Sequence, residues 1–112
     1  MLPAIALAGR LQRDSAVTSE SVMIAAARLE RLKADVAEGR TAPGGSLDAA
    51  VDGWYVLLDR SGAAVPDARA VYECRARVTP AVSPGVVIAA VRVSLRGQTD
   101  VAITLSTAVH DE

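Results

Sequence analysis

Few side chains of this 112-residue chain are of the types that perform nucleophilic or proton-transfer chemistry. There is one cysteine, Cys74, and one histidine, His110. A reactive thiolate needs a base or a positive charge that lowers its pKa, and the sequence positions no base to activate Cys74. His110 lies near the end of the sequence, where chains fray. We therefore predict no catalytic residues and no enzymatic activity, and we expect Cys74 to act as a small buried hydrophobe.

Metal binding would need several ligands gathered at one place. One thiol and one imidazole argue against a structural zinc site, and a single cysteine excludes an internal disulfide. Oxygen-rich loops suit calcium, and four aspartates flank the first expected strand, namely Asp48, Asp52, Asp59 and Asp67. Their spacing does not match the twelve-residue calcium-binding loop. We predict turn and capping roles for them, and we expect neither a metal nor a cofactor.

Arginines are the remaining groups that could bind a charged partner. Four are expected on the outer face of a sheet, namely Arg75, Arg77, Arg92 and Arg96. No aromatic residues alternate with them to stack nucleic-acid bases, and a formal net charge of −1 gives the chain no field that attracts phosphate. We predict a solvated face and no nucleic-acid binding. The residues that we expect to contact a partner at the surface are Asp52, Tyr55, Arg75, Arg77 and Arg92.

The elements that position these residues begin with a helix, expected over residues 1–39. Apolar residues recur at alternating three- and four-residue steps, which places them on one stripe that faces the sheet. The stripe consists of Val22, Ala25, Leu29, Leu32 and Val36. The charged residues fall mostly off this stripe, and Arg31 and Asp35 can pair one turn apart. Gly39 and the Pro43-Gly44-Gly45 turn end the helix.

The first eleven residues, "MLPAIALAGRL", have a different character from the rest of this helix. They are apolar almost all round, whereas an amphipathic surface helix has a polar face. We interpret them as the tail of a longer apolar helix, and a helix tucked into the domain core is the alternative. The sequence contains neither a run of about 20 apolar residues nor a secretory signal peptide.

Four strands are expected after a connector over residues 40–53, at 53–60, 69–78, 86–95 and 100–109. The second strand alternates, with Tyr72, Cys74, Ala76 and Val78 on its inward face. Trp54 and Tyr55 are neighbours in the first strand and must point to opposite faces. Gly97 favours an antiparallel hairpin between the last two strands. The prediction is a single α+β domain, with the helix covering a four-stranded antiparallel meander over residues 54–112.

These segments, in this order, resemble the prepilin-type proteins, which are the type IV pilins, especially minor pilins, and the pseudopilins of type II secretion. The resemblance spans nearly the whole chain. It is carried by "SVMIAAARLERLKADV", "GGSLDAAVDGWYVLLDRSG", "VYECRARV" and the hairpin from "VVIAAVRVSL" to "VAITLSTAV". It implies a pilin-like fold, in which a long apolar helix continues into an amphipathic half that packs on an antiparallel sheet.

The resemblance also implies a function. The chain would be a non-enzymatic structural subunit that assembles into a filament through its N-terminal helix, of which Leu2, Ile5, Leu7 and Leu11 would be the remnant. Its partners would be other pilin or pseudopilin subunits and an inner-membrane assembly platform, and it would meet the membrane only through a missing N-terminal segment. It would lie in the bacterial cell envelope, with its globular part in the periplasm or in an extracellular pilus.

The sequence departs from the family in one respect. The basic leader, the glycine before the cleavage point and the aromatic-Thr-Leu-x-Glu run are not found in it, so no residue is assigned to processing. We interpret the sequence as a soluble piece of such a subunit. Two other classes stay open, a small soluble α+β module that binds a protein or a ligand, and a minor pilin that contacts DNA in an uptake system.

Overall fold

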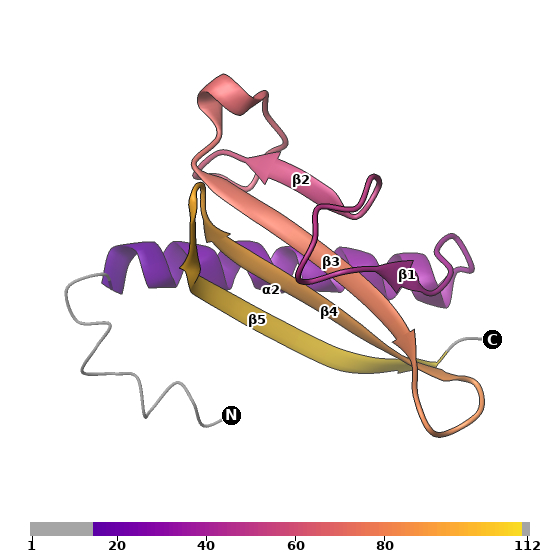
Figure 1. Cartoon of the computed structure of the whole chain (residues 1–112). Helices are drawn as coiled ribbons and strands as arrows, with labels where there is room; N and C mark the ends of the chain where they lie inside the picture. Colours follow the sequence, from indigo (N-terminus) through magenta and orange to yellow (C-terminus); the bar gives the residue numbers. More distant parts are fainter. Residues whose placement is uncertain (1–14, 111–112) are drawn as a thin grey trace.

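The computed structural model describes residues 15–110, apart from the side chains of residues 15–18 and 99–101. One helix, α2 (Ser15–Ala37), lies across one face of an antiparallel sheet (Figure 1). The strands are β1 (Gly44–Gly45), β2 (Tyr55–Leu58), β3 (Tyr72–Pro80), β4 (Val86–Leu95) and β5 (Gln98–His110). The residues expected to pack in a filament helix lie outside the described part: Leu2, Ile5, Leu7 and Leu11.

The fold is α+β, but the sheet has five strands rather than the four that we predicted. Strands β3, β4 and β5 are consecutive neighbours, and β1 and β2 both pair with the remaining edge of β3. Gly44 lies opposite Val78, and Tyr55 lies opposite Arg75. The extra strand, β1, falls inside the segment that we predicted to be a connector.

A glycine is required in β1 because the backbone passes very close to its neighbours. Gly45 has a φ of +85°, and a Cβ on it would overlap the carbonyl oxygen of Ala76 and lie 2.8 Å from Cδ2 of Trp54. Glycine adopts positive φ without steric cost and permits close backbone approach. The pair of glycines that we predicted to form a turn therefore also pairs with β3.

Helix α2 packs on β4 and β5 through a stripe that differs at one position from the prediction. Ala25, Leu29, Leu32 and Val36 are buried, but Val22 is 40% exposed, and the prediction that it faces the sheet is wrong. Ile24 is buried instead, at 5% exposure. Val22 and Ile24 are about 200° apart around the helix, so they lie on opposite flanks. The loop after β2 covers only the flank of Ile24, where Gly62 packs against it.

The core lies between α2 and the inward faces of the strands. It contains Tyr72, Cys74 and Val78 of β3 together with a run of alternate residues on β4, Val87, Ala89, Val91 and Val93. Leu58 of β2 is also fully buried. Small branched side chains dominate this layer because the chain has no phenylalanine.

Candidate functional site

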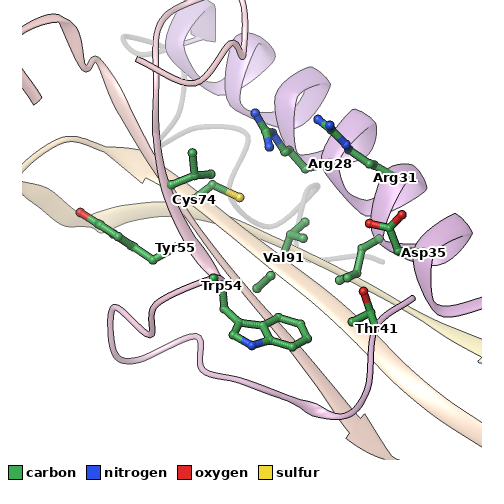
Figure 2. Close-up of a pocket in the computed structure, with 12 residues that line it drawn as sticks. Arg28, Arg31, Asp35, Thr41, Trp54, Tyr55, Cys74 and Val91 are labelled. Carbon is green, nitrogen blue, oxygen red and sulfur yellow. The ribbon is translucent and has the colours of Figure 1, made fainter. Parts of the chain in front are cut away.

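A cavity of about 250 Å³ lies between α2 and the sheet, beside the single tryptophan of the chain (Figure 2). We call it the Trp54 cavity. Its apolar lining is supplied by one residue of the helix and by inward-facing residues of three strands, with Trp54 as a wall: Leu32, Val56, Cys74, Ala76 and Val91. The period-two alternation of the strands places these side chains on the helix-facing side of the sheet.

The polar side chains at the Trp54 cavity come mainly from one flank of α2. Arg28, Arg31 and Asp35 recur at steps of three and four residues, so they share that flank, which faces β2 and β3 (Figure 2). Arg28 Nη2 donates a hydrogen bond of 2.8 Å to the carbonyl oxygen of Gly62. This contact holds the loop after β2 against the helix.

The helix spacing predicted an ion pair between Asp35 and Arg31, but Asp35 does not pair with Arg31 in the structure. Its Oδ1 instead accepts hydrogen bonds from Nε and Nη2 of Arg40, at 3.2 and 2.7 Å. The turn at Gly39 brings Arg40 back over the last turn of the helix, where its backbone N–H donates to the carbonyl oxygen of Asp35 at 2.8 Å. Within residues 15–110, the side chain of Arg31 makes no ion pair or hydrogen bond.

Cys74 forms part of the cavity floor and is 3% exposed, so it is buried as the strand alternation predicted. Burial raises the pKa of its thiol to about 11, an effect that the positive charge of Arg28 only partly offsets. A thiol that stays protonated at neutral pH is a poor nucleophile. Cys74 therefore presents an uncharged, weakly polar surface to the cavity.

Trp54 and Tyr55 point to opposite sides, as expected for neighbours entering a strand. The Trp54 indole lines the cavity on the helix side, and Figure 2 shows the Tyr55 ring directed away from it. On the outer face of the sheet, the guanidinium carbon of Arg75 lies 5.3 Å from the centre of the Tyr55 ring. Such a cation–π contact stabilises the arginine on that face.

The outer face carries the arginines that we expected to be solvated, and for Arg75 the expectation is wrong. The Arg75 side chain is 15% exposed, and Nη2 forms an ion pair of 2.9 Å with Glu73, which is itself 3% exposed. Arg96 joins the same carboxylate at 3.3 Å and also binds Asp67 at 2.6 Å. A buried carboxylate between two guanidinium groups forms a charged network inside the protein.

The other predicted surface residues are more open. Asp52 is exposed, and Tyr55, Arg77 and Arg92 are half-buried. Arg92 donates to the carbonyl oxygen of Leu47 at 3.0 Å and to Oγ1 of Thr104 at 3.1 Å. A phosphate that binds Arg92 would have to replace these internal contacts.

The four aspartates around the first strand do not converge on one point. Asp48 pairs with Arg92 and Asp67 with Arg96. Asp59 accepts hydrogen bonds from the Ser61 hydroxyl and from the backbone N–H of Ala63, and these bonds lower its pKa. Across residues 15–110, no three His, Cys, Asp or Glu side chains gather as metal ligands. His110, the last residue of β5, is exposed.

One polar cluster that links α2 to the sheet was not predicted from the sequence. Glu20 accepts hydrogen bonds from Tyr72 and from Arg60, which are 52 and 40 residues away in the chain. Both bonds lower the pKa of Glu20, and the Arg60 bond is the larger cause. No local pattern announces partners at this separation, because only the packing of helix on sheet brings them together.

The face of α2 that points away from the sheet carries a narrow apolar strip between exposed charged residues, among them Glu30 and Glu38. Met23 is 73% exposed, and the other members are small. Among the helix residues whose side chains the structure describes, the exposed alanines are Ala26, Ala27, Ala34 and Ala37. No helix within the described residues is long and apolar enough to cross a membrane.

Comparisons with family models, with curated proteins and with solved structures find no match for this chain.

Proposed function

We propose that the chain is a non-enzymatic structural subunit of the prepilin type, a minor pilin or a pseudopilin, which assembles into a filament through its helix. The observation that carries this proposal is the outward face of α2. A helix that serves only to cover a sheet has charged residues opposite its buried stripe. Here that face carries charges as well, Glu30 and Glu38 among them, but Met23, Ala27 and Ala34 form an exposed apolar strip between them.

Small side chains on an exposed helix face suit close contact with another helix. Packed helices lie about 8–10 Å apart, and alanines permit the shorter end of that range. Contacts between different patches of identical subunits form a closed ring only if the rotation between subunits allows closure. Where the rotation does not close, the same contacts build a filament. The helix-on-sheet arrangement suits this role because the sheet secures one side of α2 and leaves the other for neighbours.

The proposal is tested by photo-crosslinking in the bacterium that makes the protein. A photoreactive residue at Ala34, on the outward face of α2, is expected to yield crosslinks to other subunits. The same residue at Ser106, an exposed position of β5 on the face of the sheet opposite α2, is the matched control and should yield far fewer. Crosslinks at Ser106 alone, or absence of the chain from sheared filaments and envelope fractions, would contradict the proposal.

A second test needs only the gene. If the chain is a prepilin-type subunit, the reading frame upstream of Met1 should encode a basic leader and an apolar run with a glutamate near its start. An unrelated upstream frame would favour the alternative of a small binding module, for which the Trp54 cavity is the specific supporting observation.

A further inference from the structure

We propose that the Trp54 cavity binds a small monocarboxylate, with its carboxylate at the guanidinium of Arg31 and its compact apolar body against Trp54, Leu32 and Val91. This inference goes beyond a role in a filament and does not depend on it. It rests on the shape and lining of the cavity and on the pairing of the charges around it.

The cavity is apolar inside and positively charged at its edge. On the side of the sheet and Leu32 its lining is aliphatic or aromatic except for the neutral thiol of Cys74, so an apolar body can pack there, while the polar side chains of Arg28, Arg31, Asp35 and Thr41 lie at the edge. Two guanidinium groups, those of Arg28 and Arg31, stand on the same flank of α2 (Figure 2). The opposing charge of Asp35 is neutralised by its ion pair of 2.7 Å with Arg40.

Arg31 is the better partner for the ligand. Arg28 is partly committed, because its Nη2 donates to the carbonyl oxygen of Gly62. Arg31 is exposed and, among the described residues, has no competing acceptor. A guanidinium presents two parallel N–H groups that match the two oxygens of one carboxylate.

The volume and the charges define the ligand class. About 250 Å³ corresponds to roughly eight groups of the size of water, at about 30 Å³ each. That is the size of a carboxylate with a short aliphatic or single-ring body. A second negative charge would be placed against the apolar lining, which disfavours dicarboxylates and phosphate esters.

Hexanoate is a suitable probe, and hexanamide is its neutral match in shape. Trp54 is the only tryptophan, so its fluorescence reports directly on occupation of the cavity. We expect a saturable fluorescence change with hexanoate, with a Kd on the order of 1 mM, a reasonable value for a ligand of this size. Hexanamide should bind at least several-fold more weakly, and the Kd for hexanoate should rise with salt.

Two arginine variants complete the test. Arg31→Gln should weaken hexanoate binding about tenfold, because charge-assisted hydrogen bonds to the carboxylate are lost. Arg69→Gln, which removes an exposed arginine that does not line the cavity, should leave the Kd unchanged. Circular dichroism of both variants establishes that they are folded.

Three results would overturn the proposal: no saturable change of Trp54 fluorescence up to about 50 mM hexanoate, more than tenfold above the expected Kd; equal binding of hexanamide; or an Arg31→Gln variant that binds like the wild type. Binding detected by calorimetry without any change at Trp54 would also overturn it. Such a result would place the ligand outside the Trp54 cavity, for example in the neighbouring hollow, which Arg28 and Arg31 share with Met23 and Gly62.

Discussion

The hydroxyl of Tyr72 donates a hydrogen bond of 2.6 Å to Oε1 of Glu20, and so joins the start of β3 to α2. Tyr72 is 1% exposed, and its ring lies in the core while its hydroxyl reaches the helix surface. Nη2 of Arg60 binds the other oxygen of Glu20 at 3.0 Å. One carboxylate therefore connects α2 with β3 and with the loop after β2, and it fixes the position of the helix along the sheet.

Replacing Tyr72 by phenylalanine should destabilise the fold without changing its shape. The ring that fills the core remains, but its hydrogen bond to Glu20 is lost. We expect the free energy of unfolding to fall by about 1.5–3 kcal/mol, the usual contribution of a hydrogen bond to a charged group. Urea denaturation followed by circular dichroism measures this change. Tyr55→Phe is the control, because no hydrogen bond of the Tyr55 hydroxyl occurs among the described residues, and an equal loss in both variants would contradict the prediction.

The stability of the chain should also depend on Tyr72 at alkaline pH. Burial, together with the hydrogen bond to Glu20, raises the pKa of Tyr72 from 10.0 to about 12. Below pH 10 the phenol is protonated in both the folded and the unfolded chain, and its contribution to stability is complete. Between about pH 10 and pH 12 the unfolded chain loses this proton while the folded chain keeps it, so stability falls as pH rises.

Urea denaturation at pH 9, 10 and 11 tests this dependence. The wild type should lose stability over that range more steeply than Tyr72→Phe, which has no phenol at this position. Parallel slopes for the two proteins would show that Tyr72 does not cause the alkaline loss.

Glu73→Ala should be among the most destabilising changes on the outer face of the sheet. Glu73 is 3% exposed and pairs with Arg75 and Arg96. Its removal would leave the buried guanidinium of Arg75 without a carboxylate, which typically costs about 3–5 kcal/mol. The exposed pair of Glu30 and Lys33 provides the control, since losing such a surface pair changes stability by less than about 1 kcal/mol. Equal effects of Glu73→Ala and Glu30→Ala on the urea midpoint would refute this expectation.

The sequence was sufficient for the features that depend on local periodicity. Alternating residues predicted which side of β3 carries Cys74, and three- and four-residue steps predicted the burial of Leu29 and Leu32. The prediction from periodicity was wrong at Val22, because the spacing of apolar residues shows where the buried stripe is centred but not how wide it is. The loop that reaches α2 at Gly62 decides which flank is covered, and that contact is not encoded near Val22.

The candidate site was harder to predict because it depends on contacts between distant segments. The Trp54 cavity needs Arg31 from the helix, Trp54 before β2 and Val91 from β4. The sequence suggested an ion pair that would have occupied Arg31, whereas Arg40 takes Asp35 after the helix ends. Likewise, the outer face was predicted to be solvated. The residues next to Glu73 in the sequence do not show that Arg96, which follows β4, forms an ion pair with it.

Gly45 offers a direct test of why β1 exists. Gly45→Ala would place a Cβ against the carbonyl oxygen of Ala76 and the Trp54 ring, at a residue with a φ of +85°. Gly39 is the matched control, because its φ of +72° is similar but an added Cβ meets nothing within 4 Å. Positive φ alone costs an alanine about 1–2 kcal/mol, so Gly39→Ala should lose about that much. Gly45→Ala should lose at least about 2 kcal/mol more, since overpacking adds its own cost, and it should shift the Trp54 emission. Equal losses in the two variants, with unchanged emission, would mean that the backbone at Gly45 does not need to approach Ala76 so closely.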